Sequence, residues 1–136
     1  MLENSLRILK HKGVTGFVIA LYYLAKANIY RRLLGQRYLK KKIFNYWMWL
    51  DTLDRGIGRT LILFGQREED HRIILQKVLK PGMTVLDIGA NIGYYAMMER
   101  ELVGETGRII AVEPAQGNIA TLKRNVALNG YQNIDF

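Results

Sequence analysis

The sequence contains no cysteine and only two histidines, His11 and His71. The lack of cysteine excludes a disulfide framework, a cysteine-ligated zinc site and a thiol nucleophile. With so little histidine, neither a histidine-rich metal site nor a histidine-based catalytic triad is expected, and we predict no metal site. Long apolar runs are also missing. The stretch at residues 14–25 is too short on its own for a spanning helix, which needs about 20 apolar residues.

The chain has 136 residues, 49% of them hydrophobic and 24% charged, which is typical of one globular domain. Its net charge of +8 is unevenly distributed, because residues 1–42 carry +9 and the remainder carries −1. This asymmetry indicates an anionic partner for the N-terminal part, either a membrane surface or, less favoured, a nucleic acid. A solvated basic face on a helical arm explains the charge equally well, and the sequence leaves both interpretations open.

Apolar residues at helical spacing predict an amphipathic helix in the N-terminal arm. The predicted row is Val14, Phe17, Val18, Leu21, Ala25, Ile29 and Leu33. Such a helix could lie in a membrane interface or pack against protein, and we slightly favour packing. A basic start before an apolar centre resembles a signal peptide, but basic residues also follow at 31–42 and favour retention of that flank. We therefore predict a cytoplasmic protein, with a peripheral membrane position as the open alternative.

Two short apolar runs follow the arm, at 43–53 and 60–64, on either side of a glycine-containing loop at 54–56. This pattern predicts a β-hairpin. Residues 68–80 then predict a helix, because acidic residues stand at its start, basic residues stand at its end, and Pro81-Gly82 follows.

From residue 83 the pattern alternates between strands and helices. Strands are predicted at 84–88 and 108–112, with a third opening at 133–136, and helices at 92–103 and 116–129. Alternation of this kind predicts an α/β fold with a Rossmann-like, doubly wound parallel sheet. We divide the chain into a basic helical arm (1–42), a hairpin plus helix (43–80) and the N-terminal part of a ligand-binding domain (81–136).

The loop after the first of these strands is the candidate site. Gly89 permits a sharp turn, and Gly93 lies near a helix start, where free N–H groups can face a ligand. The spacing excludes a dinucleotide fingerprint, because Asn91 and Tyr94 stand where glycines would be required. Asp87, just before the loop, would repel a pyrophosphate. Glu113, at the end of the second strand, can accept both hydroxyls of a ribose. A nucleoside with a cationic end fits both acids, and S-adenosylmethionine is such a molecule.

These segments, VLDIGANIGYYA at 85–96 and IIAVEPAQGNIATLKRNVALNG at 109–130, resemble class I S-adenosylmethionine-dependent methyltransferases, and more closely the FkbM family. The resemblance covers about residues 48–136. It implies a seven-stranded sheet and O-methylation of a hydroxyl on a small molecule or sugar. It also implies that the cofactor contacts Asp87, Gly89, Ala90, Asn91, Gly93, Tyr94, Glu113 and Pro114, with Tyr95 beside Tyr94 either closing the pocket or packing. Asn125 and Asn129 also carry the resemblance, although capping the helix end explains both as well.

Only the first part of the implied domain is recognisable in these residues. We therefore expect a fragment that is inactive alone, with no catalytic residue or acceptor site that can be named. Two alternatives remain at this point. The first is an RNA or protein methyltransferase whose basic arm binds the substrate. The second is an inactive remnant that binds a membrane or a partner.

Overall fold

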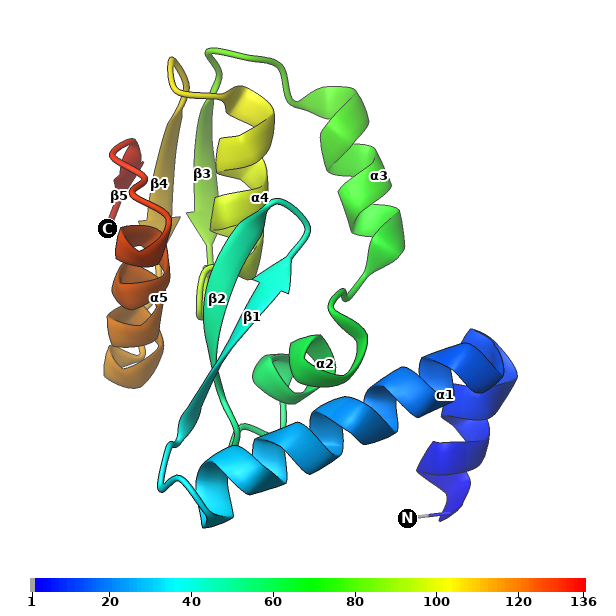
Figure 1. The fold of residues 1–136 in the computed structure, drawn as a ribbon. Coiled ribbons are helices and arrows are strands. Elements are labelled where there is room, and N and C mark those ends of the chain that lie inside the picture. The colour runs from blue at the N-terminus through cyan, green and yellow to red at the C-terminus, as the bar shows by residue number, and fades with distance from the viewer. Residues whose placement is uncertain (1) are drawn as a thin grey trace. The chain divides into compact units, whose positions relative to one another are not determined.

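The computed structural model describes residues 2–136, with side chains described from Gly13 onward. Figure 1 shows the order of the elements along the chain. They are α1 (Leu2–Arg32), β1 (Tyr38–Ile43), β2 (Tyr46–Asp51), α2 (Ile57–Phe64), α3 (Glu69–Val78), β3 (Thr84–Ile88), α4 (Tyr94–Val103), β4 (Arg108–Val112), α5 (Gln116–Leu128) and β5 (Ile134–Asp135). Strands β1 and β2 form a two-stranded sheet, and β3, β4 and β5 form a second sheet. The chain divides into two compact units, one of residues 1–43 and 50–67, the other of residues 44–49 and 68–136.

In the first unit, helix α1 confirms the predicted N-terminal helix, which is interrupted at Gly13 (φ 66°, ψ −177°). Helix α1 packs against α2, and Ala20, with 2% exposure, is the most buried residue of the helix from Gly13 onward. The predicted apolar row is not the packed face, since Val14 and Val18 are 70% and 57% exposed. The side of α1 that carries Ala20 is therefore the buried side of its described part.

The hairpin forms earlier in the chain than predicted, because its first strand is β1. Residues Leu39, Lys41 and Ile43 of β1 are buried and alternate with more exposed neighbours, as in a half-buried strand. The sequence does not show this alternation, because the buried position 41 is occupied by a lysine. Its Nζ donates to the carbonyls of Leu61 (3.0 Å) and Ile62 (2.7 Å), so a charged residue occupies a core position.

The prediction of a strand at 60–64 is wrong, because these residues belong to helix α2. The helix begins where Asp54 accepts the backbone N–H groups of Gly56 (2.7 Å) and Gly58 (2.6 Å). It ends at Gly65, whose left-handed conformation (φ 71°) closes the last turn. A short apolar run does not distinguish a strand from a buried helix by periodicity alone.

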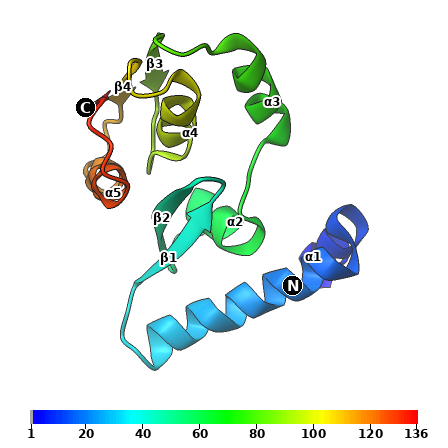
Figure 2. The ribbon, with the colours of Figure 1, turned by 45° about the horizontal axis from the view of Figure 1, so that its top comes forward.

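The second unit confirms the predicted α/β architecture. Strands β3, β4 and β5 are parallel, with Asp87 opposite Ala111 and Ile109 opposite Ile134. Both β3 and β4 have the predicted bounds, while α4 begins two residues later than predicted, because residues 89–93 form the loop. Figures 1 and 2 show α4 and α5 on the same side of the three strands. Ile109, Ala111 and Ile134 are buried in the sheet.

Helix α5 is tied to β2 through two asparagines, and this contact lies within the second unit. Asn129 accepts the N–H of Trp47 (2.8 Å) and donates to the carbonyl of Trp47 (2.8 Å). Asn125 accepts the N–H of Trp49 (2.7 Å). Four residues of helix advance about 6 Å and two residues of strand about 6.6 Å, so the two spacings match. Both asparagines therefore bond to the strand. Asn129 is also the C-cap residue of α5 and donates to the carbonyl of Asn125 (2.7 Å), which confirms the capping role considered for it.

Within the described part of the chain, no helix has the length and apolar character needed to cross a membrane.

Candidate functional site

The candidate site lies at the carboxyl ends of β3 and β4, where the loop 89–93 and Glu113 meet. The ends of these strands are in register, with Ile88 opposite Val112. The loop is held to β4 by the N–H groups of Gly89 (2.8 Å) and Ala90 (3.0 Å), which both donate to the carbonyl of Val112. In open parallel sheets, ligands bind at the carboxyl ends of the strands. The topology thus brings together the two segments that the sequence indicated.

Glu113 is fixed in this site by three hydrogen bonds. Its Oε2 accepts the N–H of Asn91 (2.9 Å), and its Oε1 accepts the N–H of Ala115 (2.8 Å) and the amide of Asn118 (3.3 Å). The bond from Ala115, with those from Asn91 and Asn118, holds the pKa of the Glu113 carboxyl below its usual value, although burial opposes the shift. The carboxylate is therefore charged and oriented before any ligand binds.

The backbone of the loop shows why its glycines are needed. Gly89 and Gly93 adopt left-handed conformations (φ 83° and 90°), and Asn91 (φ 52°) shares this region as a non-glycine residue. A Cβ on Gly93 would lie 3.2 Å from Cγ of Leu122, so this glycine also permits close packing of α4 and α5. Nothing described lies within 4 Å of a Cβ built on Gly89, so this side of the loop is open to a ligand.

Asp87 lies beside the loop, in a cavity of about 270 Å³. The other residues that line it are His71, Ile74, Leu75, Tyr95 and Glu99. Burial raises the pKa of Asp87, while the N–H of Ala96 opposes the rise. Burial, with repulsion from Asp87, raises the pKa of Glu99 to about 7. One oxygen of each carboxyl, Asp87 Oδ2 and Glu99 Oε2, has no hydrogen-bond partner among the described residues.

The other predicted site residues, Ala90, Tyr94 and Pro114, differ in their burial. Tyr94 is 1% exposed, and its ring lies 5.1 Å from that of Tyr95 and 6.5 Å from that of Phe44. Ala90 is also buried, and Pro114 is exposed beside Glu113. Tyr94 therefore belongs to the core, whereas Tyr95 lines the cavity beside Asp87, where its hydroxyl bonds with Glu68 and with Nδ1 of His71 (3.1 Å).

Reasoning from the sequence missed Glu99 and Asn118. Glu99 lies one helical turn after Tyr95 on α4, between Met98 and Arg100, and is 7% exposed. An acidic residue on an otherwise apolar helix face was the available signal. Asn118 gave no signal, because its contact with Glu113 depends on how β4 leads into α5.

A family model described as protein-L-isoaspartate(D-aspartate) O-methyltransferase (PCMT) matches residues 71–136. The solved structure of M. jannaschii TYW2 in complex with AdoMet superposes with a TM-score of 0.57 at 18% identity, and the match covers 72% of this chain and 41% of that chain. The chain has the class I methyltransferase fold. The parallel sheet, the glycine loop and Glu113 all lie within residues 71–136, the segment that the family model matches.

Two relatives, both named protein-L-isoaspartate O-methyltransferase, match parts of this chain. Protein-L-isoaspartate O-methyltransferase 1 of Archaeoglobus fulgidus is 38% identical over 56 residues, which are 41% of this chain and 26% of the relative. The protein-L-isoaspartate O-methyltransferase of Methanococcus maripaludis strain C5 is 25% identical over 127 residues, which are 90% of this chain and 58% of the relative. The chain thus spans about a quarter to just over half of these relatives.

These matches correct one part of the sequence interpretation. They support the class I methyltransferase, but they do not support the resemblance to the FkbM family or a small-molecule or glycan hydroxyl as the acceptor. The motif shared by 85–96 and 109–130 lies in the cofactor half of the fold, which methyltransferases with different acceptors have in common. The acceptor could therefore not be predicted from those residues.

Proposed function

We propose that this chain is part of an S-adenosylmethionine-dependent methyltransferase that esterifies the carboxyl group of an isoaspartyl residue in a protein substrate. The observation that carries the proposal is the isoaspartate family model over residues 71–136, which spans both the glycine loop and Glu113. The relatives with that activity in their names support the same acceptor. Of the alternatives considered from the sequence, a protein methyltransferase agrees best with these matches.

The residues of the site fit S-adenosylmethionine. Glu113 is a charged acceptor at the carboxyl end of β4 and would bind the ribose hydroxyls. The open side of Gly89 admits a ligand against the backbone, and the orphaned Oδ2 of Asp87 is a ready acceptor for an ammonium group. When bound, this cofactor supplies an electrophilic methyl group on a sulfonium.

Within such a reaction, these residues bind and orient rather than transfer protons. A carboxylate acceptor is already nucleophilic at neutral pH, so methyl transfer to it needs positioning and no general base. The polar partners Glu113 and Asp87 fix the two ends of the ligand.

Ribose binding at Glu113 would compete with Asn118 for the acceptor positions of the carboxylate. A carboxylate offers about four acceptor positions, and three are already used by Asn91, Ala115 and Asn118. Two ribose hydroxyls therefore exceed the free capacity. The Asn118 contact, at 3.3 Å, is the longest of the three and is the one we expect to be displaced.

The test has a binding arm and a methyl-transfer arm. Calorimetry of the 136-residue chain with S-adenosylmethionine should give one site. Incubation of the complete gene product with methyl-labelled S-adenosylmethionine should label an isoaspartyl peptide and leave the matched aspartyl peptide unlabelled. Absence of cofactor binding would contradict the methyltransferase assignment. Binding without labelling of the isoaspartyl peptide would contradict only the proposed acceptor.

A further inference from the structure

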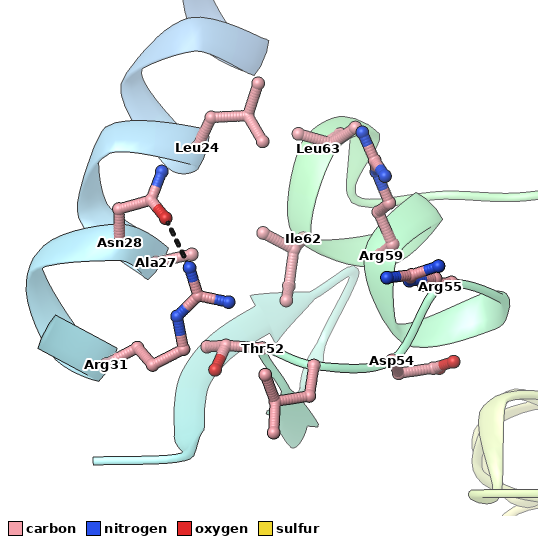
Figure 3. A pocket seen from close by; sticks show the side chains of 11 residues that line it. Leu24, Ala27, Asn28, Arg31, Thr52, Asp54, Arg55, Arg59, Ile62 and Leu63 are labelled. Atoms are coloured by element: carbon pink, nitrogen blue, oxygen red, sulfur yellow. Dashed lines mark hydrogen bonds between the residues drawn. The ribbon is translucent and has the colours of Figure 1, made fainter. Parts of the chain in front are cut away.

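A second cavity, of about 240 Å³, lies wholly within the first unit and is separate from the methyltransferase site. It is formed by α1, α2 and the loop that joins β2 to α2. Figure 3 shows the side chains that line it, with Arg31 on the α1 wall and Arg55 and Arg59 on the wall formed by α2 and the loop before it. The cavity thus gathers three guanidinium groups from two helices and a loop.

The three arginines have few partners of their own. Arg31 donates to Oδ1 of Asn28 (3.0 Å), an uncharged acceptor. Arg55 and Arg59 form no hydrogen bond or ion pair with any side chain from residue 13 onward, to which the description of side chains extends. The amide nitrogen of Asn28 is likewise without an acceptor among those residues. The donors in the cavity are therefore available to a ligand.

The single acid in the cavity does not neutralise these arginines by contact. Both oxygens of Asp54 accept backbone N–H groups, from Gly56 (2.7 Å) and Gly58 (2.6 Å), and the carboxylate serves to start α2. Three guanidinium groups and one carboxylate leave the cavity lining with a net charge of +2. This charge matches a phosphate monoester, which carries about −1.5 to −2 at neutral pH.

We propose that the cavity lined by Arg31, Arg55 and Arg59 binds a phosphate monoester attached to an apolar group. Guanidinium forks suit phosphate oxygens, because each fork can make two parallel N–H···O bonds. The apolar group would lie against Leu24, Ile62 and Leu63, which line the same cavity beside the arginines. The phosphate monoester could come from a soluble metabolite or from a lipid headgroup such as phosphatidic acid.

The experiment uses the 136-residue chain and three probes, namely phenyl phosphate, inorganic phosphate and phosphatidylcholine vesicles with or without phosphatidic acid. We expect phenyl phosphate to bind in the millimolar range or tighter, and more tightly than inorganic phosphate, because its ring contacts the leucines. Arg59→Gln should weaken binding by roughly fivefold or more, since hydrogen bonds to charged groups are lost. Arg55→Lys should weaken it less, because charge is kept while the fork is lost.

Arg32→Gln is the matched control, because it removes the same charge from an exposed position on α1 outside the cavity. Vesicle binding that needs phosphatidic acid and Arg59 but not Arg32 would identify a lipid source. Phenyl phosphate binding without vesicle binding would identify a soluble ligand. The proposal is overturned if phenyl phosphate fails to bind at millimolar concentration, or if Arg32→Gln weakens binding as much as Arg59→Gln does.

Discussion

Asn125 donates its side-chain N–H to the carbonyl of Ile92 across 2.9 Å, and so joins the middle of α5 to the glycine loop. The same amide accepts the N–H of Trp49 through its oxygen (2.7 Å). Asn125 is 0% exposed, and its bond to Ile92 is buried, whereas its bond from Trp49 is partly buried. A single buried amide thus holds a strand and the loop in fixed positions.

We expect Asn125→Ala to lower the free energy of unfolding by about 2–4 kcal/mol, because a buried carbonyl and a partly buried N–H lose their partners. Urea unfolding followed by circular dichroism measures this loss. Gln116→Ala, at the exposed start of the same helix, is the control and should change stability by less than about 0.5 kcal/mol. Equal stability of both variants would show that the Asn125 bonds contribute little.

Glu113→Ala should weaken S-adenosylmethionine binding by at least about tenfold, because hydrogen bonds from ribose hydroxyls to a charged acceptor are lost. Asn118→Ala should leave the affinity unchanged or increase it, because the ribose no longer competes with the Asn118 amide. Calorimetry compares both variants with Glu105→Ala, whose side chain is 90% exposed. Undiminished affinity in a folded Glu113→Ala variant would remove Glu113 from the site.

Stability should depend on pH through Glu99. Its pKa is about 7 in the folded chain against an ordinary 4.5, so the folded state binds more protons than the unfolded state between these values. The free energy of unfolding should then fall as pH rises from 4.5 to 7, by about 3 kcal/mol at most. Repulsion from Asp87 contributes to this rise, so the pKa that the experiment measures describes the two carboxyls together.

Glu99→Gln should remove this pH dependence and make the chain more stable than the parent above pH 7. Urea titrations at several pH values provide the test, with Glu105→Gln as the exposed control. If the free energy of unfolding of Glu99→Gln still falls between pH 4.5 and 7, another group causes the pH dependence.

Two glycines should respond in opposite directions to the same substitution. A Cβ on Gly107 would lie 2.4 Å from Cγ2 of Val103 and 2.8 Å from the carbonyl oxygen of Met83, so Gly107→Ala should destabilise the second unit by at least about 1–3 kcal/mol. Nothing described lies within 4 Å of a Cβ on Gly117, in helix α5, where alanine should stabilise by about 0.5–1 kcal/mol. Thermal melts of both variants measure the two changes in stability. A lower melting temperature for Gly117→Ala would contradict the prediction for that glycine.

Lys41→Met should destabilise the first unit by about 1–3 kcal/mol, because the carbonyls of Leu61 and Ile62 lose their bonds from Nζ, and only the N–H of Gly65 still donates to the Leu61 carbonyl among the bonds described. Lys42→Met, on the exposed side of the same strand, is the matched control. An unchanged unfolding midpoint in Lys41→Met would indicate that removing a buried charge offsets the lost bonds.

The sequence predicted those parts of the fold whose signals are local. Strands β3 and β4 combine apolar runs with glycine boundaries, and α3 and α5 show helical spacing with clear ends, so all four were found near their observed bounds. The first strand was missed, because the burial of Lys41 depends on carbonyls some 20 residues away. Similarly, Glu99 gains its unusual surroundings only when α4 packs on β3, beside Asp87.

The pairing of Asn125 and Asn129 with β2 also bears on association between copies of the chain. A strand with unpaired N–H and carbonyl groups is a template for strand addition, and thereby for aggregation. Here the amides of α5 occupy the main-chain groups of Trp47 and the N–H of Trp49. A helix thus shields this tryptophan-rich strand from intermolecular β-pairing, a protection that more commonly comes from charged residues, proline or a bulge.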